Sequence, residues 1–178
     1  MSPPDKMAPP WQVLDGDIAN KRGERSLLTY RDVLSQFHVE VNPRYAPRQG
    51  TTFCNIYVWD CTRALGCEVP HWVGPAGQAV PPGQGTETTA NALLPWFIRR
   101  GPAEGWKEVY PQDALVHVQE GRPCVAQYTA PRGHGHIAMV LPGPNGSLNV
   151  AQAGGKCLFD VPLKTGFGTC TPRFFIHE

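Results

Sequence analysis

The spacing of apolar residues predicts helices in the first two thirds of the chain and strands in the last third. Helical spacing, with apolar positions three and four residues apart, occurs in four segments: 29–37, 51–66, 86–100 and 111–118. A short extended piece and a series of apolar runs follow as predicted strands: 105–109, 124–128, 135–141, 148–153 and 174–177. This order predicts an α+β fold in which N-terminal helices pack on a C-terminal antiparallel β-sheet.

One turn indicates how the later strands pair. Asn145-Gly146 is a strong hairpin signal between strands 135–141 and 148–153. If the hairpin centres on this pair, opposed residue numbers sum to about 291, which puts Gln152 near Met139. A shift of several residues is compatible with the sequence, so the pairing leaves the neighbours of His136 open.

Composition indicates one domain without an excess of charge of either sign. The chain has 178 residues, a formal net charge of +1 and 17% charged residues, which argues against nucleic acid or an acidic surface as a partner. Nineteen Gly and nineteen Pro indicate many turns, and the Gly/Pro-rich loop 74–85 exceeds the usual loop length. Residues 1–25 are predicted to form a flexible arm or linker, and residues 26–178 a single domain.

No segment suggests a membrane span or a secretory signal. The apolar runs fall short of the roughly 18 residues that a membrane span needs, and the first residues lack an apolar signal core. We therefore expect synthesis in a cytoplasm with reduced thiols. The six cysteines include no CxxC pair, which argues against a structural zinc site.

Cys54 is the candidate nucleophile. It lies in the first turn of the second predicted helix, which Thr51 or Thr52 is expected to cap and Gly66 to end. Backbone amides and the dipole at a helix N-terminus stabilise a thiolate, which is the nucleophilic form of cysteine. Cys61 lies two turns further along the same helix and is expected to be a core thiol.

His136 is the candidate general base. It heads an apolar strand after a glycine, so we expect it at the rim of the sheet, where a histidine can deprotonate a thiol. His134 competes for this role, but only His136 directly precedes the apolar run. A neutral histidine base needs its other ring nitrogen held by a polar acceptor. Gln152 is preferred as that acceptor, Asn149 is its rival and Asp160 a weaker one.

The other residues of these two types are expected to be structural. The remaining histidines are assigned to the core or the surface: His38, His71, His117 and His177. The remaining cysteines are expected to be core thiols, with a Cys157–Cys170 disulfide left open: Cys67, Cys124, Cys157 and Cys170. Trp72 and Trp106 are expected to be buried, with a place in a cleft as the alternative.

Five motifs follow one another between about residue 30 and residue 178: Thr52-Phe53-Cys54-Asn55-Ile56-Tyr57, Gly105-Trp106, Gly121-Arg122-Pro123, Gly135-His136-Ile137-Ala138-Met139-Val140 and Ala151-Gln152-Ala153-Gly154. Their order resembles the papain-like NlpC/P60 and CHAP superfamily of cysteine peptidases and amidases. The resemblance implies a papain-like domain over residues 26–178, with Cys54 as nucleophile, His136 as base and Gln152 as the polar third residue. Many members have His, Asn, Asp or Glu at that third position, and other residues where this chain has Asn55.

The resemblance implies a cysteine amidase or endopeptidase that cuts an amide bond, most often in peptidoglycan peptides, through a thioester on Cys54. The backbone amide of Cys54, with Gln49 or Tyr45 as a second donor, is expected to hold the oxyanion. The reaction needs no metal or organic cofactor. An acyl- or peptidyl-transferase, a protein-directed peptidase or deamidase, and a non-catalytic binding module are the alternatives.

The resemblance also implies a place of action. Without a signal peptide, the chain is expected to reach the cell wall, periplasm or exterior by lysis or delivery, as an endolysin, as a bacterial effector or as part of a larger protein. An immunity or delivery protein is then a further expected partner.

Overall fold

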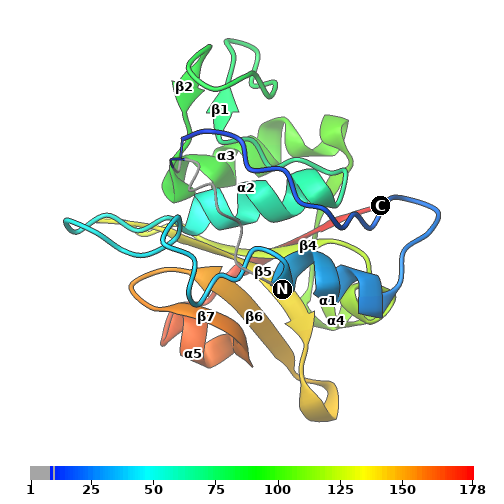
Figure 1. Cartoon of the computed structure of the whole chain (residues 1–178). Helices are drawn as coiled ribbons and strands as arrows, with labels where there is room; N and C mark the ends of the chain where they lie inside the picture. Colours follow the sequence, from blue (N-terminus) through cyan, green and yellow to red (C-terminus); the bar gives the residue numbers. More distant parts are fainter. Residues whose placement is uncertain (1–8, 10) are drawn as a thin grey trace.

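Six antiparallel strands form the central sheet of the molecule (Figure 1). The computed structural model describes residue 9 and residues 11–178. In spatial order the strands of the sheet are β3 (Trp106–Val109), β8 (Arg173–His177), β4 (Cys124–Tyr128), β5 (His136–Pro142), β6 (Leu148–Ala153) and β7 (Cys157–Pro162). A separate two-stranded ribbon joins β1 (Trp72–Val73) to β2 (Thr86–Glu87).

Helices cover both faces of this sheet. They are α1 (Leu27–Ser35), α2 (Cys54–Ala64), α3 (Ala90–Arg99), α4 (Pro111–Gln119) and α5 (Leu163–Phe167), with short 3-10 turns η1 (Gly101–Glu104) and η2 (Pro144–Gly146). The predicted α+β class is confirmed. The sequence predicted helices packed on the sheet without assigning them to its faces, and the structure places α4 and α5 on the face opposite α2 and α3 (Figure 1).

The alternation of β5 explains the two cores. Ile137 and Met139 pack with the α1–α2–α3 side, whereas Ala138 and Val140 pack with α4 and α5. Successive side chains of a strand point to opposite faces, so a strand that is covered on both sides reads as a continuous apolar run. This is why the run after His136 is uninterrupted.

Two helices begin later than the sequence predicted. Helix α2 begins at Cys54 with Phe53 as N-cap and no side-chain capping bond, so the predicted Thr51 or Thr52 cap is wrong. Helix α3 begins at Ala90, because Thr86 is used in β2 and the Thr89 side chain accepts the capping bond. The late start of α2 leaves its first amides without a capping side chain.

The hairpin between β5 and β6 is one residue tighter than predicted. Met139 pairs with Ala151 and Pro142 with Leu148, which centres the turn on Asn145 rather than between Asn145 and Gly146. Asn145 adopts a left-handed φ of 53°, a conformation that asparagine tolerates better than most residues. Gln152 therefore lies one residue beyond the partner of Met139.

The described part of the predicted N-terminal arm runs along the body of the molecule (Figure 1). Buried Asn20 donates to the carbonyl of Gly121, and Arg44 donates to the carbonyls of Pro9 and Gln12. Residues 1–8 and 10 of this arm lie outside the described residues.

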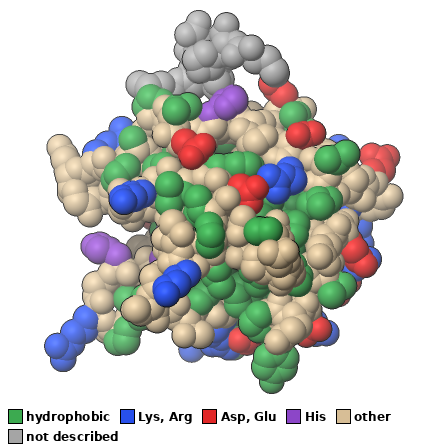
Figure 2. All heavy atoms as spheres, turned by 90° about the horizontal axis from the view of Figure 1, so that it is seen from below, with side chains coloured by type: hydrophobic (Ala, Val, Ile, Leu, Met, Phe, Trp, Pro, Cys, Tyr) green, Lys and Arg blue, Asp and Glu red, His purple; other side chains and the backbone are tan. Residues whose placement is uncertain are grey.

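The surface mixes both signs of charge. On the face shown in Figure 2, Lys and Arg side chains alternate with Asp and Glu rather than gathering in one large patch. Among the described residues, no helix has the length and apolar character needed to cross a membrane.

Candidate active site

A pocket of about 460 Å³ opens where the N-terminus of α2 meets the segment between β2 and α3 and the loop before β5. Cys54 lies in its wall, 3% exposed. His134 and Gly135 line it, while the ring of His136 lies behind them and is not part of the lining among the described residues. Of the three predicted catalytic residues, Cys54 alone faces this space.

The backbone surrounds Cys54 with hydrogen-bond donors. Amides of Ile137, Asn55 and Cys54 itself approach the sulfur closely enough to favour its thiolate form. Burial has the larger effect, however, and raises the pKa of the Cys54 thiol above its usual value. This contact places the sulfur at the start of β5, because Ile137 directly follows His136.

The first turn of α2 offers donors that have no oxygen acceptor. Ile56 and Tyr57 donate to the carbonyl of Phe53, whereas the amides of Cys54 and Asn55 make no backbone or side-chain bond to an oxygen within the described residues. The first amides of a helix have no partner inside the helix, and Phe53 supplies no capping oxygen. These two amides are therefore available to an anionic group in the pocket.

Gln152 holds the ring of His136. His136 Nε2 lies 2.8 Å from Gln152 Oε1, and the Gln152 amide nitrogen donates to the carbonyl of Lys156 at 3.3 Å. That second bond fixes the amide orientation, so Oε1 accepts and Nε2 of the neutral ring carries the proton. The other ring nitrogen, Nδ1, is then left with its lone pair, as a general base requires.

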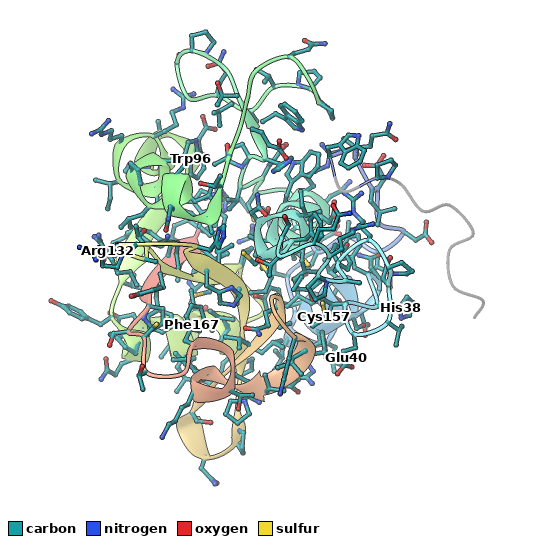
Figure 3. The ribbon with its side chains drawn as sticks, turned by 90° about the vertical axis from the view of Figure 1, so that its left-hand side faces the viewer. His38, Glu40, Trp96, Arg132, Cys157 and Phe167 are labelled. Atoms are coloured by element: carbon teal, nitrogen blue, oxygen red, sulfur yellow. The ribbon has the colours of Figure 1, made fainter. Side chains whose placement is uncertain are left out.

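Helix α5 packs close behind this pair. The Phe167 ring, labelled in Figure 3, lies 4.9 Å from the His136 ring. A Cβ at Gly166 would come within 2.6 Å of Gln152 Oε1, so only glycine lets the helix approach this closely. The sequence did not predict α5 or β7, and both help to position Gln152.

The pKa shifts of Cys54 and His136 favour a pair in which both side chains are neutral. Burial lowers the pKa of His136, although the Gln152 bond opposes this, and burial raises the pKa of Cys54. Both shifts disfavour a thiolate–imidazolium pair in the resting state. No hydrogen bond joins Cys54 to His136 in the part of the chain that the structure describes.

The two rivals of Gln152 belong to another network. Asn149 donates to the Asp160 carboxylate at 2.8 Å, and Arg31 forms an ion pair with the same carboxylate. These hydrogen bonds outweigh burial and lower the pKa of Asp160. The structure thus brings Gln152 to His136, and brings Asn149 and Arg31 to Asp160.

The two extra oxyanion candidates lie elsewhere. The Tyr45 hydroxyl is buried and donates to Asp60 at 2.7 Å, which engages it away from the pocket. Gln49 is exposed on the loop before α2, with a left-handed φ of 51°, and does not line the pocket. The amide of Asn55, which the sequence analysis did not consider, is the better-placed second donor.

Sequence reasoning missed a second polar group in the pocket wall. Asn55 donates to the carbonyl of Thr88 at 2.6 Å and lies 3.2 Å from Nδ1 of His71. His71 Nε2 in turn lies 2.8 Å from Glu87 Oε1. His71 was assigned a structural place, and only the polar Asn55 directly after the nucleophile signalled this group in the sequence.

The thiols and the tryptophans have structural surroundings. All six cysteines are free, so the Cys157–Cys170 disulfide that was left open is not formed, and Cys157 donates to the carbonyl of Tyr45. Trp106 is buried in the core, and Trp72 is half-buried in β1. Within the described residues, no three His, Cys, Asp or Glu side chains gather as metal ligands.

No family model matches the chain, and no curated protein matches it.

Proposed function

We propose that this protein is a cysteine amidase or endopeptidase that hydrolyses an amide bond through a thioester on Cys54. One observation carries the proposal: Cys54 lies at a pocket and at a helix N-terminus, beside the strand that starts at the Gln152-bound His136. The papain-like fold and the choice of peptidoglycan peptides as substrate rest on the resemblance to NlpC/P60 and CHAP enzymes. An α+β architecture with a six-stranded antiparallel sheet is compatible with the papain-like fold.

The chemistry begins from the neutral pair. Nδ1 of His136 takes the proton of the Cys54 thiol as the sulfur bonds to the amide carbon, so no resting ion pair is needed. Cys54 packs in the core on the Ile137 side of β5, whereas the His136 ring contacts Phe167 of the opposite core. The mechanism therefore requires the first residue of β5 and the loop before it to move when substrate binds, so that the ring reaches the sulfur. The amides of Cys54 and Asn55 hold the oxyanion of the tetrahedral intermediate.

The intermediate then breaks its carbon–nitrogen bond. His136 gives its proton to the leaving amine, which departs and leaves the acyl group on sulfur. Water next attacks the thioester while His136 takes a proton from it, and collapse releases the carboxylic acid. The returning proton restores the Cys54 thiol. Gln152 keeps the proton of His136 on Nε2 during the resting part of the cycle.

Digestion of purified peptidoglycan tests the proposal. The wild type should release peptide fragments that mass spectrometry assigns to one type of scissile bond, and Cys54→Ala should release none. Cys61→Ala is the matched control, because Cys61 is an equally buried thiol on the same helix and does not line the pocket. The Cys61→Ala variant should cut at a rate within about threefold of the wild type, because removing a buried core thiol acts on stability rather than on the reaction.

The same experiment separates the alternatives. Equal fragment yields from the wild type and Cys54→Ala would overturn the mechanism. Fragments joined to an added amine would identify a transferase rather than a hydrolase. Absence of fragments, together with Cys54-dependent cleavage of protein substrates, would replace peptidoglycan by a protein target.

A further inference from the structure

One wall of the pocket is formed by Glu87 of the β1–β2 ribbon and by His71 and Thr88, which flank the ribbon. Trp72 pairs with Glu87 and Val73 with Thr86, so Glu87 is fixed at the base of the ribbon. Loop 74–85, which closes the ribbon, is tied to α3 by a bond from Trp96 Nε1 to the carbonyl of Gly77. Figure 1 shows this ribbon projecting above α2 and α3. The loop that stood out in the sequence therefore supports one side of the pocket.

His71 holds the Glu87 carboxylate in place. The Asn55 amide nitrogen donates to the carbonyl of Thr88, which fixes the orientation of that amide, and its second hydrogen points to Nδ1 of His71. Nδ1 is therefore an acceptor, and the proton of the neutral ring lies on Nε2, 2.8 Å from Glu87. Burial favours this neutral form and lowers the pKa of His71, although Glu87 opposes the shift.

Nδ1 of His71 thus accepts from Asn55, while Nε2 lies at ion-pair distance from Glu87 Oε1 without the direction of a hydrogen bond. His71 is 2% exposed and cannot turn towards Cys54 without breaking both contacts. It acts as a positioning residue for Glu87 rather than as a second base. Because Asn55 directly follows Cys54, the carboxylate is connected to the nucleophile through two side chains.

The pocket has a single formal charge in its wall. None of the described residues that line it is Lys or Arg, and Glu87 supplies the one carboxylate. The arginines around it are engaged elsewhere. Arg44, whose charge acts on His71, forms a buried ion pair with Asp60. Arg48 lies over the ring of Phe53 and donates to the carbonyls of Pro43 and Arg44, and Arg132 extends outward from its loop in Figure 3. The Glu87 side chain is 57% exposed, so a ligand can reach it.

We propose that Glu87 is a specificity-determining residue that binds an ammonium group of the substrate beside the scissile amide. This inference rests on the proposed function, because it concerns the substrate of the Cys54 reaction. A carboxylate next to apolar walls prefers a cation, and a charge-assisted hydrogen bond from an ammonium group is roughly twice as strong as a neutral one. The substrate class is therefore a peptide with a free amine, rather than one whose amines are blocked.

The test uses a synthetic peptidoglycan stem peptide with free amines and the same peptide with every amine acetylated. Glu87→Gln keeps an oxygen for His71 Nε2 and removes only the charge. It should raise KM for the free peptide about 3–5-fold with kcat nearly unchanged, because the carboxylate is partly exposed, and alter the acetylated peptide by less than about 1.5-fold. Glu40→Gln, an exposed change on the other side of the molecule (Figure 3), is the control and should alter neither.

A binding measurement separates this inference from the proposed function. Cys54→Ala should bind the free peptide more tightly than the acetylated one, and the added Glu87→Gln change should remove that preference, whether or not the wild type cuts the peptide. Equal binding of both peptides, or a preference that survives Glu87→Gln, would overturn the role of Glu87. Full activity of Cys54→Ala would instead overturn the proposed function.

Discussion

Helix α2 carries two buried polar regions that are organised in opposite ways. In its second half, the Asp60 carboxylate is 0% exposed and accepts bonds from Arg44 Nε at 2.7 Å, from a second Arg44 nitrogen at 2.9 Å and from the Tyr45 hydroxyl at 2.7 Å. At its first turn, Cys54 has only backbone amides beside its sulfur and an open pocket in front of it.

The difference separates a stabilising region from a reactive one. A buried carboxylate with all its oxygens engaged contributes to one arrangement of the chain, because removing a partner leaves an uncompensated charge. A buried thiol whose neighbouring amides contact only its sulfur and no oxygen acceptor has no such completed network and can interact with a ligand. Changes near Asp60 should therefore alter stability, and changes near Cys54 should alter turnover.

The largest effect is expected from His136→Ala. Loss of the general base should lower kcat/KM by about 10²–10⁴-fold, because a positioned base contributes rate enhancement of that order. Steady-state kinetics on the peptide substrate measures this, and circular dichroism checks that the fold is kept. His134→Ala is the control, since His134 is exposed at the pocket rim and should cost less than tenfold. A larger loss for His134→Ala than for His136→Ala would transfer the role of base to His134.

A smaller and different effect is expected from Asp60→Asn. Arg44 is buried and would lose its carboxylate partner, so the free energy of unfolding should fall by about 3–5 kcal/mol. Urea denaturation measures this, and activity per folded molecule should stay within about threefold of the wild type. Asp32→Asn, an exposed change on α1, should alter stability by less than about 0.5 kcal/mol. Loss of activity without loss of stability in Asp60→Asn would contradict the view that the Asp60 end of α2 stabilises the fold and the Cys54 end reacts.

The sequence was most informative where periodicity is strong. Apolar spacing located helices α1, α2, α3 and α4 and most strands of the sheet, and the Asn145-Gly146 signal placed the turn to within one residue. The choice of Gln152 before Asn149 agrees with the contact to His136, although spacing alone left that choice open. Periodic segments reflect burial on one face, which is the physical signal that a single sequence carries best.

The sequence was least informative where long-range contacts decide the outcome. Strand β7 turns through a left-handed Asp160 at φ 56°, and α5 has only five residues, so neither has a clear period. The pairing of residues 72–73 with 86–87 spans a long loop, and it took Thr86 out of the predicted helix 86–100. The His71–Glu87 contact depends on that pairing, which explains why His71 was assigned a structural place.

The smallest effect is the most specific test of how the two regions differ. Because burial lowers the pKa of His136, the rise of kcat/KM with pH should have its midpoint below 6.5, the usual value for histidine. Gln152→Glu would place a carboxylate where the amide oxygen now lies, 2.8 Å from Nε2, and would favour the imidazolium. Raising the pKa of His136 keeps the base protonated over a wider range, so the rising limb should move upward by about 1–3 pH units.

With a shift of about one pH unit, the Gln152→Glu variant should be about 5–10-fold slower than the wild type at pH 6 and should approach its rate at pH 8.5, and a larger shift should widen the difference at pH 6. Asn149→Asp is the matched control, because it adds the same charge beside Asp160, away from the His136 ring. It should leave the midpoint unchanged and act on stability, since two carboxylates would then share Arg31. An equal shift in both variants would mean that the pH profile responds to the net charge of the protein rather than to the contact between residue 152 and His136.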